Sequence, residues 1–124
     1  MLTEKFFEVL KYEGVVSLIT WNEQEANVTN TWNSYLQVTK DEKILVPVAG
    51  MHSIEADIKL GSNLKITLGA REVMGRDNYQ GTGFKLLGTG KFITKGENFD
   101  YMLAKYPFIR SVLEITIQDL KQLL

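Results

Sequence analysis

Alternation of apolar and polar residues, the mark of strands with one buried face, covers most of this chain. It is clearest at residues 64–71, where apolar side chains occupy every second position. Residues 15–21 carry apolar side chains on both faces, which is typical of a fully buried strand. Further strand candidates are residues 28–39, 44–46, 83–94 and 111–118. The pattern therefore predicts a mainly β protein of roughly six strands.

Three shorter segments have the i, i+3, i+4 spacing of an amphipathic helix. Residues 3–12 start at Thr3, a good N-cap, and residues 99–106 end before a proline that cannot continue a helix. Residues 52–60 have Ser53 as their candidate N-cap. After the last strand, residues 119–124 are expected to form a short tail, with one helical turn as the alternative.

The strand candidates follow one another through turns too short for a crossover helix, so antiparallel pairing is expected. Long strands with few helices favour a small antiparallel barrel with peripheral helices. Gly88 and Gly90 share one face of a strand, which indicates sharp coiling or a close approach by another group. Pro47 is expected at a sheet edge or a bulge. The 124 residues have the length of one domain, residues 1–124.

The composition excludes most kinds of unaided catalysis. There is no cysteine, so disulfides, thiolate metal sites and cysteine nucleophiles are impossible. His52 is the only histidine and is expected as a capping or surface residue. The 14 Lys and Arg residues against 15 Asp and Glu give a net charge of −1, so nucleic acid is not an expected partner. Redox or enzymatic work would need a bound cofactor that brings its own chemistry.

A membrane is not an expected partner either. No run approaches the ~18 consecutive apolar residues of a membrane span. Acidic and basic residues are mixed in Met1–Lys5, which is not the pattern of a targeting signal. A cytoplasmic location is therefore expected.

Two large aromatic residues stand among polar ones in the segment Asn30–Tyr35. One interpretation places Trp32 in the core and Tyr35 on the opposite face of a regular strand. The other is a flat ligand stacked near Trp32 or Tyr35, with Asn30 and Thr31 as hydrogen-bonding partners. On spacing alone, the core interpretation is favoured.

Two other segments have features of a phosphate site. At Pro47–Ser53 a strand breaks and a helix begins, so free backbone N–H groups are expected there; the alternative is an ordinary strand–helix turn. Arg71 and Arg76 precede the glycine-rich turn Gly81–Gly83 and could clamp a phosphate; the alternative is a solvated surface. Together the three segments indicate a planar ligand that carries a phosphate, and FMN is such a molecule.

Six runs stand in order along the chain: Phe6–Leu10, Glu13–Val16, Asn30–Leu36, Val46–Val48, Gly50–His52 and Gly81–Phe84. In these runs the chain resembles a known family, the small FMN-binding proteins of the pyridoxamine 5′-phosphate oxidase-like split-barrel family. The run Asn-Thr-Trp-Asn-Ser-Tyr is the specific one, whereas Gly-Thr-Gly-Phe alone is not. This chain departs from the family pattern at Ala49, Ser53-Ile54 and Phe108, where the pattern has Gly, Lys-Thr and Trp.

The resemblance implies a six-stranded antiparallel split β-barrel of Greek-key type with short peripheral helices. It also implies a homodimer with non-covalent FMN at the subunit interface. The cofactor-binding residues that it implies are Asn30, Thr31, Trp32, Tyr35, Pro47, Val48, Ala49, Gly50, Met51, Ser53, Arg71, Gly81, Thr82, Gly83, Phe108 and Leu124. Leu124 is expected to reach toward the partner's flavin. Glu13 is expected to lower the redox potential, because its negative charge near the cofactor disfavours added electrons.

The leading hypothesis is therefore electron transfer through FMN, with a redox partner that the sequence does not name. One alternative keeps the fold: a flavin-dependent oxidase or reductase of the pyridoxamine-phosphate oxidase or flavin reductase type, with a second substrate beside the flavin. Another alternative is a non-redox small-barrel binding module, in which Trp32 and Tyr35 stack on single-stranded nucleic acid. The near-neutral charge argues against this last alternative.

Overall fold

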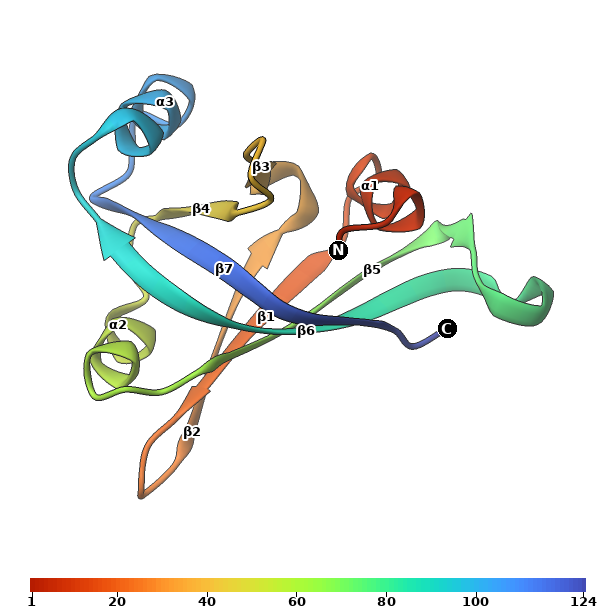
Figure 1. The fold of residues 1–124 in the computed structure, drawn as a ribbon, viewed down its shortest axis with the longest axis horizontal. Coiled ribbons are helices and arrows are strands. Elements are labelled where there is room, and N and C mark those ends of the chain that lie inside the picture. Colours follow the sequence, from red (N-terminus) through yellow and green to blue (C-terminus); the bar gives the residue numbers. More distant parts are fainter.

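Seven strands of the computed structural model, which describes residues 1–124, form one antiparallel sheet. They are β1 (Val15–Trp21), β2 (Ala26–Trp32), β3 (Gln37–Val38), β4 (Ile44–Val48), β5 (Leu64–Met74), β6 (Gln80–Ile93) and β7 (Ser111–Gln122). Hydrogen bonds join them in the order β2-β1-β5-β6-β7-β4-β3. The predicted mainly β antiparallel architecture is confirmed, and Figure 1 shows how strongly the sheet coils. The strand beyond the expected count is β3, only 2 residues long.

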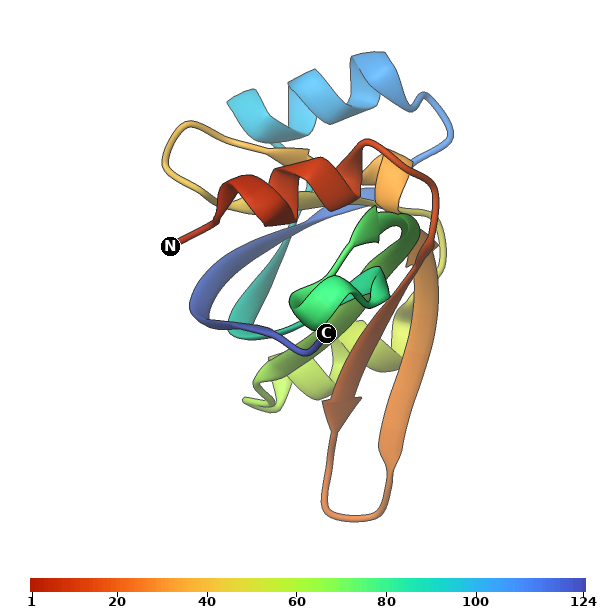
Figure 2. The same cartoon turned by 90° about the vertical axis from the view of Figure 1, so that its right-hand side faces the viewer.

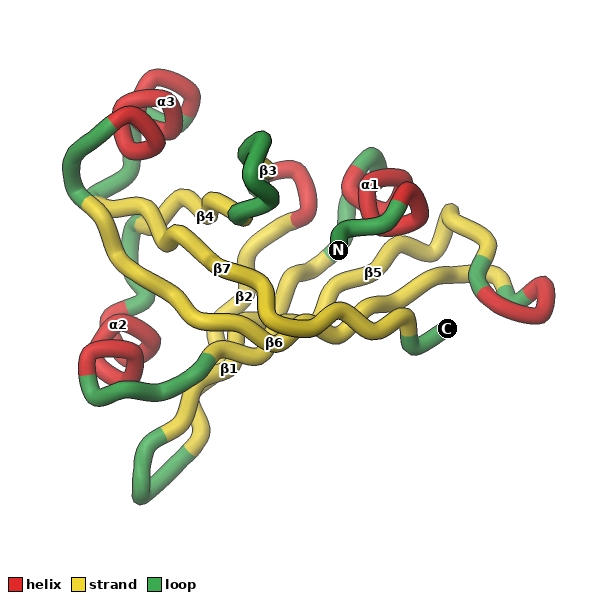
Figure 3. Tube along the Cα trace, viewed as in Figure 1, coloured by secondary structure: helices red, strands yellow, loops and turns green.

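Three helices lie at the margins of the sheet: α1 (Glu4–Leu10), α2 (His52–Lys59) and α3 (Glu97–Lys105). Figure 2 shows α1 and α3 at one end of the molecule and the β1–β2 hairpin projecting at the other. Short 3-10 turns follow β2 (η1, Asn33–Tyr35) and β5 (η2, Arg76–Asn78); they are the unlabelled red segments of Figure 3. None of the helices has both the length and the apolar character needed to cross a membrane.

The core lies inside the curl of the sheet. Its main cluster has 17 buried side chains, which come from α1, β1, β4, β5, β6 and β7 together with Leu36. A smaller cluster under α3 joins Leu45, Met102, Ile109 and Val112. β2 contributes no member to either cluster. This strand therefore packs on β1 without adding an apolar side chain to the core, and Thr31 is its one buried residue.

The single strand expected at residues 28–39 is wrong, because the chain leaves the sheet after Trp32 and forms η1. Asn33 explains the break. Its Nδ2 donates to the carbonyl oxygens of Tyr12 and Gly69, each at 3.0 Å. These hydrogen bonds hold the buried side chain of Asn33 against the segment after α1 and against β5. The backbone therefore leaves the pairing of β2 with β1 at this residue.

Two other expectations about strands are also wrong. β1 buries only one face, through Val16, Leu18 and Thr20, because its other face is not covered by the core. Residues 119–124 are not a free tail, since β7 continues alongside β6 as far as Gln122. Pairing along β6 satisfies backbone N–H and C=O groups that a tail would leave to water.

The helix ends follow the sequence in two of three cases. Thr3 caps α1 as predicted, its Oγ1 accepting from Phe6 N–H at 3.2 Å, and α3 ends before Pro107. The expected cap of α2 is wrong. Met51 occupies the N-cap position instead of Ser53, and no side chain caps the helix.

Two predictions from single residue types are confirmed. A Cβ at Gly90 would lie 2.8 Å from Cδ1 of Leu113, and one at Gly88 would overlap the backbone of β7. These glycines allow the close approach of neighbouring elements. Pro47 lies at an edge, because β3 covers only the first 2 residues of β4 and leaves the outer side of Pro47 without a partner strand.

Candidate functional site

A groove of ≈ 260 Å³ lies where the two ends of the curled sheet face each other without pairing. Thr29–Trp32 of β2 form one wall. Pro47 of β4 and Ala49–Met51, which follow that strand, form the other wall. Tyr35 and Phe108 complete the lining. Segments far apart in the sequence therefore meet at the gap in the barrel.

Two neighbouring hollows extend this groove. One is lined by Glu13, Trp32, Ser34 and Tyr35 and shares both aromatic residues with it. The other is lined by Asn27, Val28, Thr29, Met51, His52, Ser53 and Ile54 and shares Thr29 and Met51 with it. We call the three together the trough. It runs from Glu13 past the gap of the barrel to the start of α2.

Trp32 is not a core residue, so the interpretation favoured on spacing is wrong. Its side chain is 46% exposed, and β2 has a neighbouring strand only on the side of β1. The expected opposite orientation of Trp32 and Tyr35 is also wrong. The η1 turn that starts after Trp32 breaks the strand period, and both aromatic side chains line the same groove.

Three aromatic rings form a cluster at this end of the trough. The ring of Tyr35 lies 6.0 Å from that of Phe108 and 5.2 Å from that of Tyr106. The hydroxyl of Tyr106 donates to the carbonyl oxygen of Ser34 at 3.2 Å and so holds η1 in place. Phe108 is 55% exposed. The arrangement offers a large apolar surface to a flat ligand.

The two walls of the groove present hydrogen-bond donors. Oδ1 of Asn30 accepts from Ser17 Oγ at 3.0 Å, which leaves the amide N–H groups of Asn30 unused. On the other wall, the backbone N–H groups of Gly50 and Met51 donate to no atom of the protein. Met51 has φ 62° and ψ 34°, a left-handed conformation that is uncommon outside glycine and often found at functional sites.

Glu13 places a negative charge at one end of the trough. Its carboxylate accepts from Ser34 Oγ at 2.6 Å, from Ser34 N–H at 3.1 Å and from Gly14 N–H at 3.2 Å. The hydroxyl of Ser34 contributes most to lowering the pKa of Glu13, and the backbone donors lower it further. The carboxyl group is therefore ionised at neutral pH.

The structure divides the sequence-predicted residues into two groups. The trough brings together Glu13, Asn30, Thr31, Trp32, Tyr35, Pro47, Ala49, Gly50, Met51, Ser53 and Phe108. Val48 is buried beside it in β4. The trough also includes Thr29, and Arg110 binds the carbonyl oxygens of Ala49 and Gly50. No local sequence pattern marks either residue as part of a site.

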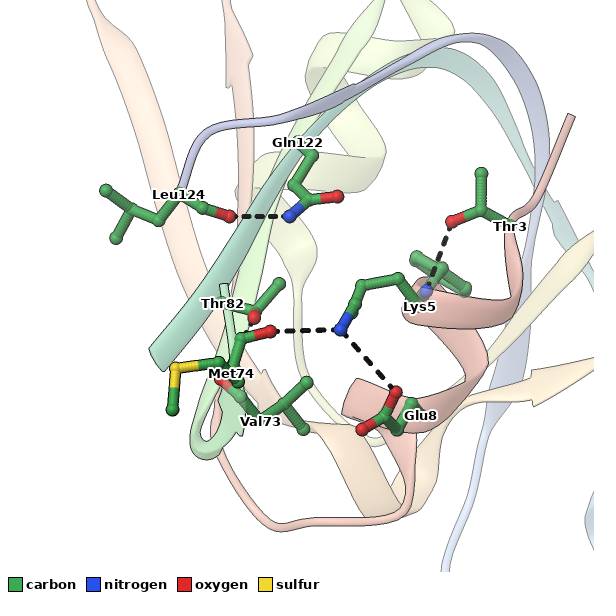
Figure 4. Close-up of polar contacts among 9 residues, drawn as sticks. Thr3, Lys5, Glu8, Val73, Met74, Thr82, Gln122 and Leu124 are labelled. Atoms are coloured by element: carbon green, nitrogen blue, oxygen red, sulfur yellow. Dashed lines mark hydrogen bonds and ion pairs between the residues drawn. The ribbon is translucent and has the colours of Figure 1, made fainter. Parts of the chain in front are cut away.

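The second group lies at the β5–β6 hairpin and the C-terminus: Arg71, Gly81, Thr82, Gly83 and Leu124. None of them lines the trough of its own chain. Figure 4 shows this region, where Thr82 Oγ1 donates to Val73 O at 3.0 Å and Lys5 Nζ donates to Met74 O at 3.0 Å. A Cβ at Gly75 would lie 2.8 Å from the carbonyl carbon of Leu124, so the C-terminus packs against the hairpin.

The coiled sheet with an open gap between its ends defines the class: a small split β-barrel with a groove in the gap. HupZ of Group A Streptococcus has this fold, with a TM-score of 0.80 at 13% identity over 99% of this chain and 94% of that one. So does a protein from Lactobacillus delbrueckii proposed to be a pyridoxamine 5′-phosphate oxidase, with a TM-score of 0.70 at 16% identity over 97% and 93% of the two chains. An FMN-binding protein from Syntrophomonas wolfei gives 0.68 at 16% identity over 88% and 76%.

Sequence comparison gives the family. No family model matches the chain. The FMN-binding protein of Nitratidesulfovibrio vulgaris (strain DSM 19637 / Miyazaki F) is 44% identical over 124 residues, which are 100% of both chains. The chain therefore belongs to the family of this FMN-binding protein.

Proposed function

We propose that this chain is an FMN-binding flavoprotein that transfers electrons, and that its trough holds the cofactor. One observation carries the proposal. The exposed ring of Trp32 on β2 faces a groove whose opposite wall presents the free N–H groups of Gly50 and Met51. The name of the relative that is 44% identical supports the choice of FMN.

The donor set of the trough fits this group. A flavin ring is flat, with hydrogen-bond acceptors along one edge, and it needs an aromatic surface and a row of donors. Trp32 and Phe108 supply exposed aromatic surface, and the N–H groups of Asn30, Gly50 and Met51 supply donors. At the α2 end, the unpaired backbone N–H groups of the first helical turn and the hydroxyl of Ser53 suit a phosphate. The family's lysine at this position is absent, so backbone groups carry more of the phosphate contact.

Bound FMN would supply the redox chemistry, accepting and releasing electrons on its ring. The chain's own residues would bind and orient the ring, keep water from its faces and set its potential. Glu13 would act on the potential through its ionised carboxylate, which lies beside Trp32 and Tyr35.

A homodimer would bring the second group of residues to the trough. Several of the chain's exposed large apolar side chains lie at these two places: Val28, Trp32 and Phe108 at the trough, and Met74, Tyr79 and Leu124 at the hairpin. Exposed apolar surface of this kind marks interaction sites. If the hairpin of one subunit covers the trough of its partner, both surfaces are buried and Arg71 and Leu124 of one chain approach the other chain's cofactor.

The test is reconstitution of the purified chain with FMN. We expect quenching of flavin fluorescence, saturation at one FMN per chain, and a dimer in analytical ultracentrifugation. The bound flavin, once reduced chemically, should pass electrons to an added ferric haem protein. A chain that binds no FMN would overturn the proposal. Rapid reduction by NAD(P)H or by pyridoxamine phosphate would move the assignment to the enzymes of this fold.

A further inference from the structure

Arg110, which directly precedes β7, holds the wall of the groove that Ala49–Met51 form. Its Nε–H donates to the carbonyl oxygen of Ala49 at 3.1 Å, and its Nη2 donates to the carbonyl oxygen of Gly50. The same Nη2 lies 3.0 Å from Oε1 of Glu55 in α2. The backbone N–H of Arg110 donates to Val48 O at 2.9 Å. One residue thus holds the whole connection between β4 and α2.

The contacts of Arg110 with the two carbonyl oxygens determine where the N–H groups of the same two peptides point. In a trans peptide the C=O and N–H bonds point in opposite directions, and the chain has no cis peptide. The carbonyl of Ala49 shares its peptide with the N–H of Gly50, and the carbonyl of Gly50 shares its peptide with the N–H of Met51. Because Arg110 donates hydrogen bonds to both carbonyl oxygens, both N–H groups point away from it, toward the groove that Gly50 and Met51 line.

The connection between β4 and α2 lies beside open space and includes a strained residue. A Cβ at Gly50 would meet nothing within 4 Å. Met51 is held at φ 62°, a conformation that costs free energy for a residue with a side chain. No side chain caps α2 to compensate. The guanidinium group of Arg110, itself oriented by Glu55, holds the two peptide groups in this orientation.

We infer that Arg110 is a positioning residue of the cofactor site: it orients the N–H groups of Gly50 and Met51 toward the hydrogen-bond acceptors of the flavin ring. This inference rests on the proposed function. Hydrogen bonds to the two carbonyls also polarise the peptides and strengthen their N–H groups as donors. Arg110 therefore contributes to binding of the flavin ring and not to binding of the phosphate.

That distinction makes the inference testable with two ligands. Riboflavin has the ring of FMN without the phosphate. If Arg110 orients ring-binding amides, its loss weakens FMN and riboflavin by the same factor. If its positive charge attracts the phosphate, its loss weakens FMN much more than riboflavin.

The experiment compares Arg110→Met and Arg110→Lys with the wild-type chain and with Lys95→Met, which removes a charge from an exposed loop residue. Lysine keeps the charge but lacks the two-pronged donor geometry. We expect both Arg110 variants to bind FMN and riboflavin about tenfold or more weakly, by equal factors, and Lys95→Met to bind as the wild type. Circular dichroism and thermal unfolding check the fold, and if Arg110→Met does not fold, Arg110→Lys carries the comparison.

NMR gives a readout that needs no flavin. The amide signals of Gly50 and Met51 should shift and broaden in the Arg110 variants of the free protein, whereas those of the β5–β6 hairpin should not. Equal binding by variant and wild type, or a loss confined to FMN, would overturn the inference and leave the proposed function standing. Failure of the wild-type chain to bind either flavin would overturn both.

Discussion

The hydroxyl of Thr20 donates a hydrogen bond to Oδ2 of Asp57 across 2.8 Å, and both side chains are buried. Nδ2 of Asn27 donates to the same oxygen at 2.8 Å, and Nδ2 of Asn22 donates to Oδ1 at 2.9 Å. No ion pair involves Asp57. A buried carboxylate is therefore held by neutral donors of the β1–β2 hairpin. The contact fastens α2, whose start lines the trough, to the hairpin that forms the opposite wall.

Removal of one donor should loosen this contact. Thr20→Val keeps the shape and strand preference of the side chain but leaves Asp57 without one hydrogen bond. We expect a loss of about 1.5–3 kcal/mol in the free energy of unfolding, the range for a hydrogen bond to a charged group. Urea denaturation measures it. Thr116→Val, at an exposed position of β7, is the control and should change stability little. If the two substitutions lower stability equally, the hydrogen bond from Thr20 to Asp57 does not stabilise the fold.

The same carboxylate should make stability depend on pH. The donors, Asn27 first and then Asn22 and Thr20, lower the pKa of Asp57 below its ordinary value. A group with a lowered folded-state pKa stabilises the fold above its unfolded-state pKa, and this stabilisation is lost as the pH falls through the folded-state value. Stability should therefore decrease as the pH falls below about 5.

The substitution Asp57→Asn isolates this contribution to the pH dependence. The variant should be less stable than the wild type at about pH 7, and the difference should narrow as the solution is acidified toward about pH 3. Asp119→Asn, at an exposed position of β7, should leave the pH profile unchanged. A stability difference that stays constant from neutral to acid pH would contradict the assignment.

Much of the fold could be predicted from local patterns, because alternation, caps and turn residues act over a few positions. The strand at residues 64–71 and the cap at Thr3 depend only on their own neighbours, and both are present. The break after Trp32 could not be predicted in this way. It depends on Asn33 reaching Tyr12 and Gly69, and these residues are close only after folding.

The candidate site shows the same limit. The segment at Pro47–Ser53 and the aromatic residues near Trp32 could be selected from their composition, and the structure brings them together. Arg110 could not be selected, since nothing in its own neighbourhood marks an arginine that binds carbonyl groups some 60 residues earlier in the chain. Arg71 and Leu124 line no part of the trough of their own chain, and only the proposed dimer would bring them to one.

Glycine at position 88 should be needed for packing, whereas glycine at position 50 should not. A Cβ at Gly88 would overlap Thr116 O of the adjacent strand, and one at Gly50 would meet nothing within 4 Å. We expect Gly88→Ala to cost about 1–3 kcal/mol of stability, as overpacking does. Gly50→Ala should leave stability within about 0.5 kcal/mol of the wild type. Chemical denaturation of the two variants tests this, and the reverse order would contradict it.

Trp32 should bind the flavin and add little to stability. Because Trp32 is 46% exposed and outside the core clusters, Trp32→Ala should not lower the melting temperature appreciably. It should weaken FMN binding about tenfold or more, through lost stacking and lost apolar burial. Trp21→Ala, which removes the other tryptophan at the far end of β1, is the matched control. Unchanged FMN affinity in Trp32→Ala would exclude stacking on this ring.

Glu13 should lower the redox potential of the bound cofactor. Its carboxylate stays ionised because Ser34 and Gly14 donate to it, and it lines the hollow beside Trp32 and Tyr35. Glu13→Gln removes the charge and keeps the shape, so reduction becomes easier. For an exposed charge we expect a rise of about 10–20 mV in the midpoint potential.

Spectroelectrochemical titration of the two FMN complexes measures this difference. Added salt should shrink it, because exposed charges are screened. The lowered pKa of Glu13 predicts that the difference persists from neutral pH into the mildly acidic range and disappears only when the carboxylate is protonated. Glu23→Gln, in the loop between β1 and β2, is the control for net charge and should leave the potential unchanged. A potential that is the same in Glu13→Gln and the wild type would show that this carboxylate does not act on the flavin.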